Sequence, residues 1–250
     1  MHPILENGKE NFLPKYSPDG KKVAYVENRA ALRVLNLESK QTRLMLSGDR
    51  NFSYSDDDVW FDWSPDGKWI LAPYLQTGRW SHEIGLADVC GEQEIYNLTK
   101  SGYESSQPLW AQDGQSMIWL SDRYGLHGDD GNQGDPQLDV YQTFFSQKAL
   151  NRFRLSPAEY EIVKANEDRT VRLTLASSRI VRAALSKDGE QLIYLAKSDK
   201  GFEIWLLKPR TKELKRLGEI ESTPKRFGAF PQQLVLDQDD KNAIVLVDGR

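Results

Sequence analysis

Apolar and polar residues alternate along this chain in short runs, and each run ends at a turn signal. The clearest example is Ser17-Pro18-Asp19-Gly20, which is followed by the β-branched and aromatic run Lys22–Val26. Pro at the second turn position presets φ, Ser can bond back to the backbone, and Gly accepts a positive φ. The pattern therefore predicts an antiparallel hairpin whose returning strand has an apolar face.

The same hairpin recurs four more times. Ser64-Pro65-Asp66-Gly67 is a close copy, a looser third copy contains Asp113, a fourth contains Asp188, and a degenerate fifth contains Asp239. The acidic positions 19, 66, 113, 188 and 239 are 47, 47, 75 and 51 residues apart. A period near fifty residues, with four short strands in each repeat, is typical of a β-propeller blade. The predicted fold class is all-β, a β-propeller segment of four to five four-stranded blades.

The repeats define units along the chain. We predict units over residues 11–52, 58–100, 106–175, 177–220 and 223–250, the last of them incomplete. The long third interval is explained by a helical insertion over 147–168, where Ser156-Pro157-Ala158-Glu159 has the cap, first-turn proline and capping-box Glu of a helix start. Because a propeller has typically about four to eight blades, we expect this segment to belong to a ring of about six or seven blades. Completion of a five-bladed ring by Met1–Leu5 is the alternative.

Composition narrows the function classes. Of the 250 residues, 39% are hydrophobic and 28% charged, which is typical of a globular domain. The formal net charge of −4 gives no electrostatic preference for nucleic acid or an anionic membrane. No apolar run approaches the roughly 18 residues of a membrane span. The Met1–Ile4 start is not a signal peptide, so we expect an exported protein to carry its signal outside this chain.

The sequence predicts no catalytic residue and no cofactor. Nucleophilic catalysis requires a Ser or Cys beside a His that a carboxylate orients. The three His are His2, His82 and His127, and no Gly-x-Ser-x-Gly elbow accompanies them. His82 and His127 are therefore expected to be ordinary loop residues. Cys90 is the only cysteine, so it cannot form an intrachain disulfide and is expected to be an unpartnered thiol at a strand end.

A metal site is likewise not predicted, although one loop invites the question. Five Asp residues and four Gly crowd the stretch Asp122–Asp139. Calcium takes several oxygen ligands from such loops, but no Glu stands at the twelfth position as in an EF-hand. A polar loop is the favoured interpretation, with calcium binding as the alternative.

Two further sets of residues have a structural and a functional interpretation. Tryptophans recur at strand positions, where packing between blades is favoured over lining of a peptide channel; they are Trp60, Trp63, Trp69, Trp110, Trp119 and Trp205. Arg179 and Arg182 flank the start of a first strand, where a propeller channel is lined. They could hold a peptide carboxylate, although surface ion pairs are the favoured interpretation.

The repeats resemble those of a known family. Ser-Pro-Asp-Gly-Lys followed by an Ala-Tyr-type strand resembles the WD40-like repeat of TolB, tricorn protease and relatives of prolyl oligopeptidase. Particular runs are similar to the tricorn-like serine peptidases of family S41, namely Asn11–Tyr25, Ile95–Tyr103, Trp119–Gly125, Asp139–Tyr141 with Phe144, Phe145 and Arg152–Ser156, and Ser177–Arg179. The resemblance covers essentially the whole chain, and the insertion after Asp139–Tyr141 is its most particular feature.

The resemblance implies a function for the whole protein. In that family the catalytic Ser and His lie in later segments, so this chain is not expected to be an enzyme by itself. It is expected to gate or guide peptides or unfolded polypeptide toward a catalytic core, with other domains of the parent peptidase as partners and a homo-oligomer as a further option. The resemblance favours a periplasmic location over a cytoplasmic one. A TolB-like protein-binding propeller and the propeller lid of a prolyl-oligopeptidase relative are the alternatives.

Overall fold

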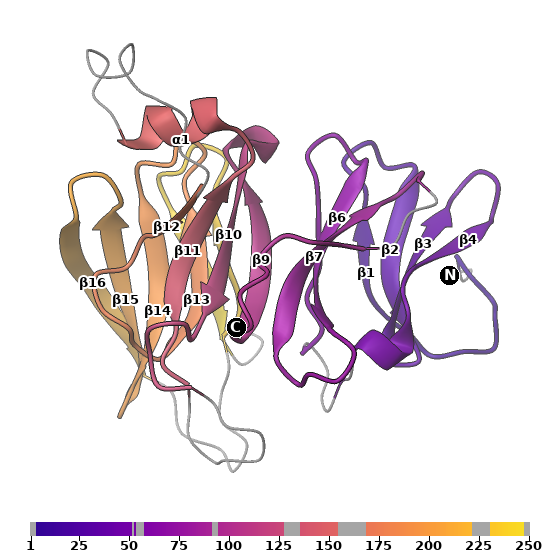
Figure 1. The fold of residues 1–250 in the computed structure, drawn as a ribbon, viewed down its shortest axis with the longest axis horizontal. Coiled ribbons are helices and arrows are strands. Elements are labelled where there is room, and N and C mark those ends of the chain that lie inside the picture. Colours follow the sequence, from indigo (N-terminus) through magenta and orange to yellow (C-terminus); the bar gives the residue numbers. More distant parts are fainter. Residues whose placement is uncertain are drawn as a thin grey trace. The chain divides into compact units, whose positions relative to one another are not determined.

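The chain folds into antiparallel sheets of four strands each. The computed structural model describes residues 4–51, 53, 58–91, 95–127, 136–154, 169–221 and 231–247. These residues form four four-stranded sheets and one two-stranded sheet, and within each sheet every strand pairs with its neighbour in sequence (Figure 1). The chain divides into two compact units, Met1–Trp110 and Ala111–Arg250. The all-β prediction is confirmed.

The first unit holds two complete sheets, which pack face to face. Its elements are β1 (Asn11–Tyr16), β2 (Lys22–Glu27), β3 (Ala31–Asn36), β4 (Thr42–Leu46), the 3₁₀ turn η1 (Gly48–Arg50), β5 (Asp62–Trp63), β6 (Trp69–Leu75), β7 (His82–Asp88) and β8 (Tyr96–Asn97). Ala24 and Val34 of the first sheet and Ile70 and Ala72 of the second belong to one buried apolar cluster. Alternation along each strand therefore buries one face of the first sheet against the second.

The second unit holds the remaining sheets, and β9 leads into it. Strand β9 (Ser105–Ala111) lies at the end of the first unit and pairs with β10 (Ser116–Ser121) of the second. The elements of the second unit are the 3₁₀ turn η2 (Gln112–Gly114), β10, β11 (Asp139–Phe144), α1 (Gln147–Arg154), β12 (Thr170–Arg172), β13 (Ile180–Leu185), β14 (Leu192–Ser198), β15 (Gly201–Lys208), β16 (Glu213–Glu221), β17 (Pro231–Leu236) and β18 (Ala243–Val247). In the described residues the last sheet is β17 and β18 alone. Leu195 of β14 and Leu234 of β17 share a buried cluster, which joins the last two sheets.

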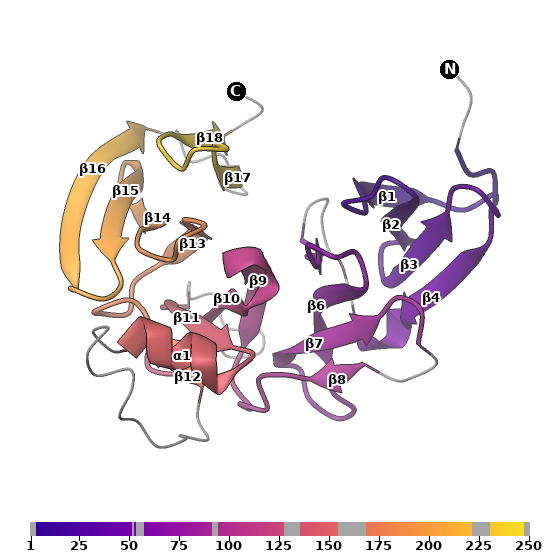
Figure 2. The ribbon, with the colours of Figure 1, turned by 90° about the horizontal axis from the view of Figure 1, so that it is seen from above.

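The helical insertion begins where the sequence predicts it. Helix α1 follows β11 directly and lies at the end of that strand (Figures 1 and 2). Ser146 caps it, because its hydroxyl accepts a bond of 3.1 Å from the amide of Ala149. Leu150 is fully buried, and the ring of Phe153 lies 5.3 Å from that of Phe144. The second helix predicted from Ser156 lies outside the described residues.

One hydroxyl–carboxylate pair organises each well-preserved hairpin turn. The Ser17 hydroxyl donates to Asp19 Oδ1 at 2.6 Å and accepts from the Lys22 amide at 2.9 Å. The Gly20 amide donates to the Ser17 carbonyl, and Gly20 adopts a φ of 69°. This positive φ is a conformation that Gly adopts at little cost. The turn thus matches the one predicted from Ser-Pro-Asp-Gly.

Two further turns repeat this geometry. Ser64 donates to Asp66 and Ser186 to Asp188, each at 2.6 Å. The serine hydroxyl, ahead of a backbone amide, holds the pKa of each of these carboxyl groups below its usual range. In the fifth copy Asp237 replaces the serine and accepts the Lys241 amide at 2.8 Å. The turn geometry therefore survives where the sequence motif has degenerated.

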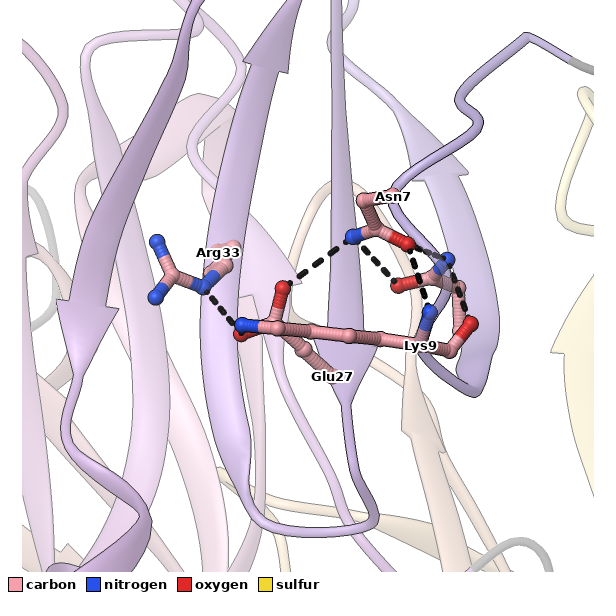
Figure 3. A network of polar contacts seen from close by, with 5 residues as sticks. Asn7, Lys9, Glu27 and Arg33 are labelled. Atoms are coloured by element: carbon pink, nitrogen blue, oxygen red, sulfur yellow. Dashed lines mark hydrogen bonds and ion pairs between the residues drawn. The ribbon is translucent and has the colours of Figure 1, made fainter.

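A buried carboxylate fixes the N-terminal segment to the first sheet. Glu27 is 6% exposed, and its carboxylate accepts Lys9 Nζ at 2.8 Å, Arg33 Nε at 2.7 Å and Asn7 Nδ2 at 3.2 Å (Figure 3). Burial raises the pKa of Glu27, but the bonds from Lys9 and Arg33 outweigh it and hold the pKa below its usual range. Glu27 is therefore satisfied as an ionised group.

Buried acids near the start of the third strand act similarly in the next two sheets. In β7, Glu83 is 1% exposed and accepts the hydroxyl of Thr99 and the amides of Ser101 and Gly102. These donors lie in the segment that leaves the sheet after its fourth strand. A carboxylate with several donors of this kind pins that exit segment to the sheet.

Asp139 does the same in β11. It is fully buried, and it accepts Arg172 at 2.8 Å, Thr174 at 2.7 Å and Ser177 at 2.8 Å. The three donors belong to β12 and to the segment after it. Because the Asp139 carboxylate is not in contact with water, these three bonds must offset the free-energy cost of burying it.

Replacement of Asp139 by Ala should lower the free energy of unfolding by about 3 kcal/mol, because breaking a buried ion pair leaves its other members without a partner. Chemical denaturation followed by tryptophan fluorescence measures this change. The matched control is Asp199→Ala, at an exposed position in the same unit, which should change stability by less than about 0.5 kcal/mol. Equal effects of the two substitutions would contradict a structural role for the Asp139 cluster.

Ser64→Ala should cost about 1 kcal/mol at neutral pH, because a buried hydroxyl that serves as donor and acceptor is lost. The pKa of Asp66 is lower in the folded state than in the unfolded state. The ionised carboxylate therefore stabilises the fold fully above its unfolded-state pKa, and this stabilisation is lost as the pH falls through its folded-state pKa. The gap between wild type and variant should therefore close as the pH drops below about 4. Thermal melts at several pH values test this, with Ser39→Ala as the exposed control; a constant gap would contradict it.

Candidate functional site

Two of the histidines lie beside carboxylates in the described part of the chain. His82 begins β7 rather than lying in a loop, and its Nδ1 is 2.9 Å from Glu104 Oε1. The exposed ring of His127 lies 3.4 Å from the buried carboxylate of Asp122. Each is a His–carboxylate pair. Cys90 is exposed.

The acidic loop is described only at its ends. Residues 128–135, which hold three of its Asp, lie outside the described residues. Of the end residues, Asp139 is engaged by Arg172, Thr174 and Ser177. Elsewhere in the described residues no three His, Cys, Asp or Glu side chains gather in a group that could hold a metal. Nor does the described part contain a helix with the length and apolarity needed to cross a bilayer.

The tryptophans singled out in the sequence differ in how deeply they are buried. Trp63 and Trp119 are buried, whereas Trp60 and Trp110 are half-buried. Arg182 donates to the carbonyl of Val181, at 2.7 Å on its own strand. Packing therefore accounts for two of the tryptophans, while Trp60 and Trp110 lie at the first strands of their sheets.

First strands of successive sheets lie side by side in the first unit. Trp63 of β5 donates its indole N–H to the carbonyl of Lys15 on β1, at 3.1 Å. One repeat later, Trp110 donates its indole N–H to the carbonyl of Asp62, at 3.3 Å. The two bonds join equivalent positions of the repeat. They bring the side chains two residues before each hairpin turn into one neighbourhood.

Lys15 is the cation of this neighbourhood. Its ammonium donates to the carbonyl of Phe61 at 2.7 Å and lies 5.5 Å and 5.0 Å from the ring centres of Trp60 and Phe61. Both distances are within the range of a cation–π interaction. Much of the residue is still exposed. Burial of the ammonium lowers the pKa of Lys15, and attraction to Asp62 opposes the change.

Asp62 is the matching anion. Its Oδ2 accepts the backbone amide of Trp110 at 3.0 Å. Burial raises the pKa of Asp62, while the Trp110 amide and the charge of Lys15 act in the opposite direction. The upward shift distinguishes Asp62 from the turn carboxylates and from Glu27, whose pKa values are lowered. Shifted groups of this kind are more frequent at functional sites.

We name Lys15, Trp60, Phe61, Asp62 and Trp110 the first-strand cluster. It offers a cation, a partly buried carboxylate and the half-buried rings of Trp60 and Trp110, at or just before the first strands of three consecutive sheets. Such a set can bind the carboxylate or carbonyl groups of an extended chain and pack against its side chains. Sequence reasoning singled out Trp60 and Trp110 but missed Lys15 and Asp62, although both stand two residues before the serine of a repeat turn.

The sheets and their pairing are those of a β-propeller. The crystal structure of TolB from Acinetobacter baumannii matches 98% of this chain and 54% of its own, with a TM-score of 0.57 and 19% identity. At this identity the likeness establishes the fold alone. No family model matches the chain.

By sequence the chain is a distant relative of tricorn protease homologues. A Tricorn protease homolog from Saccharolobus solfataricus is 29% identical over 110 residues, which are 44% of this chain and 10% of that protein. A protein described as a Tricorn-like protease C-terminal subunit, from Sulfurisphaera tokodaii, is 25% identical over 199 residues, 75% of this chain and 21% of that protein. The chain thus spans between a tenth and about a fifth of the length of these relatives. The predicted resemblance to tricorn protease and TolB is confirmed.

Lys15→Met should raise the pKa of Asp62, because the cation that favours the ionised carboxylate is removed while burial remains. A carboxyl-detected NMR titration of labelled aspartate measures the shift. Lys21→Met, which removes an exposed lysine in the first turn, is the control and should leave Asp62 unchanged. An unchanged or lower Asp62 pKa in Lys15→Met would contradict the pairing.

Proposed function

We propose that this chain is a non-catalytic propeller segment of a tricorn-like serine peptidase of family S41. In this proposal it guides unfolded polypeptide toward a catalytic core that lies outside the chain. The observation that carries the proposal is the first-strand cluster, which presents charge and aromatic surface on strands of the kind that border a propeller channel. The distant relation to two tricorn-type proteins supports it.

The first-strand cluster is suited to the chemical groups that an unfolded chain exposes. An extended polypeptide presents carbonyl groups, carboxylates and apolar side chains together. Lys15 can donate to the first two, and the Trp60 ring provides a surface for the third. Because Lys15 is partly exposed, each such contact should contribute only a fraction of a kcal/mol. Contacts of this strength let a chain advance rather than stay bound.

Location forms part of the proposal. Family resemblance alone favours export of the parent protein to the periplasm. Fractionation of cells that express the complete reading frame tests this location. Recovery of the protein in the cytoplasmic fraction would contradict it.

Unfolded polypeptide should bind this chain, and Lys15→Met should weaken that binding by about two- to fivefold, which corresponds to one partly exposed charge contact. Fluorescence anisotropy of a labelled, permanently unfolded protein measures the affinity. Lys21→Met is the charge-matched control. Binding that is equally tight for a folded protein, or unaffected by Lys15→Met, would contradict the proposal.

A TolB-like protein-binding propeller is the second candidate, because the match to TolB spans nearly the whole chain. The reading frame around this chain distinguishes the two. A serine-peptidase core encoded in the same frame agrees with the guiding role. A frame without any peptidase, together with binding of one folded partner, would favour the TolB-like function instead.

A further inference from the structure

The second unit contains a cavity of about 300 Å³ beside the helical insertion. Its walls come from α1, from the third and fourth hairpin turns and from the turn between β15 and β16. Its lining is mostly polar and includes both signs of charge; the lining residues with a role below are Asp113, Phe153, Lys187, Asp188, Glu190 and Arg210. A volume of about 300 Å³ is at the lower end of the range of ligand sites, which suits a single side chain.

Both cations of the lining already have partners. Arg210 pairs with Glu190 at 3.0 Å. Lys187 donates its ammonium to the carbonyl of Gln238 at 2.8 Å. Neither cation is thus available as the main recognition group for an anion.

The carboxylates of Asp113 and Asp188 accept fewer hydrogen bonds than they could. Asp188 receives its turn bonds, from the Ser186 hydroxyl and the Glu190 amide, on Oδ1 alone, which leaves Oδ2 outside both bonds. The Ser186 hydroxyl also holds the pKa of Asp188 low, so this group is ionised at neutral pH. Asp113 makes no hydrogen bond or ion pair recorded for the described residues. The unbalanced charge of the cavity is therefore negative.

The turn that carries Asp113 is held in an unusual conformation. Gln112 and Asp113 both have a φ of 51°, in the left-handed region. The Gln112 side chain packs so closely on Gly189 that a Cβ there would lie 2.3 Å from its Nε2. The side-chain oxygen of Gln112, Oε1, also accepts hydrogen bonds from the Ser116 hydroxyl and the Gln142 side-chain amide. The turn backbone therefore places Asp113 at the cavity, where its side chain is exposed.

The helix supplies an aromatic wall opposite these polar turns. Phe153 lines the cavity, and the centre of its ring lies 5.3 Å from that of Phe144. Ala149, one turn earlier on α1, extends the same apolar surface. An aromatic face beside unbalanced negative charge suits a cation on an alkyl stem, since the stem packs on the apolar wall and the charged head can approach the ring.

We propose that this cavity binds an arginine side chain of a polypeptide, with the guanidinium at Asp113 and Asp188 and the methylene stem against Phe153. A planar guanidinium can donate to two carboxylates at once and stack on a ring, which an ammonium does less well. The site shares no residue with the first-strand cluster. It rests on the proposed function only for the source of the polypeptide.

A pair of capped pentapeptides tests the site directly, one with a central arginine and one with citrulline, its uncharged isostere. The arginine peptide should bind the chain about three- to fivefold more tightly in calorimetric titration, as expected for one partly exposed ion pair. Equal affinities, or no binding of the arginine peptide at millimolar concentration, would overturn the proposal.

Two substitutions locate the binding. Asp113→Asn removes the charge, and Asn tolerates the left-handed backbone, so the turn should persist. It should abolish the preference for arginine over citrulline. Phe153→Leu keeps the wall apolar and should weaken the arginine peptide by about two- to fivefold. Glu38→Gln, at an exposed position in the first unit, is the charge-matched control and should have no effect.

The two proposals fail separately. If Glu38→Gln abolished the arginine preference as Asp113→Asn does, the preference would come from the net charge of the protein, and the proposed site would be overturned. Lys15→Met tests the first-strand cluster and should leave the arginine preference intact. If unfolded polypeptide binds independently of Lys15 while Asp113→Asn still removes the preference, the cavity site stands and the guiding role does not.

Discussion

The hydroxyl–carboxylate bond in the Ser-x-Asp-Gly turn is the interaction on which the rest of three of the sheets depends. It fixes the turn, and the turn fixes the register between the first and second strands. A slip of one residue would move every apolar side chain of a strand to the opposite face. Ala24 and Ile70 are buried in the same cluster because both hairpins keep this register. A local bond of 2.6 Å thus decides which face of a sheet is buried against its neighbour.

Carboxylates outside the turns fall into two kinds, and their donors distinguish them. Glu83 and Asp139 are buried with at least three donors each, so the cost of desolvation is offset by charge-assisted bonds. Asp62 has fewer donors for its burial, and its pKa is raised. The first kind stabilises the fold. The second retains interaction energy that a bound chain could use.

The hairpins could be predicted from the sequence because the signals that form them are local. Ser64, Asp66 and Gly67 are within four residues of one another, and so are the Ser146 cap and the start of α1. The first-strand cluster could not be predicted in this way. Lys15 and Asp62 are far apart in sequence, and their charges influence one another only because one sheet packs on the next. An observable signal existed, since both occupy the same place in the repeat, but periodicity alone does not show that equivalent positions touch.

The cavity escaped prediction for a related reason. It needs Asp113 in a turn that departs from the repeat, Phe153 on an inserted helix and Asp188 in a turn that follows the repeat. The sequence identified each element but gave no measure of the distances between them. The degenerate third turn is the informative case, because Gln112 replaces the proline and uses its side chain to bond Ser116 and Gln142.

In the proposed guiding role, the chain would act on a passing polypeptide through contacts of this modest size. A fully desolvated ion pair would hold the chain, whereas partly exposed charges such as Lys15 contribute fractions of a kcal/mol. Several weak sites in succession give selectivity through their number and still permit release. The same reasoning explains why the strongest charge clusters, those of Glu27, Glu83 and Asp139, are buried in the sheets. Under this proposal, the tight electrostatic bonds stabilise the scaffold, and the loosely engaged charges would bind the polypeptide.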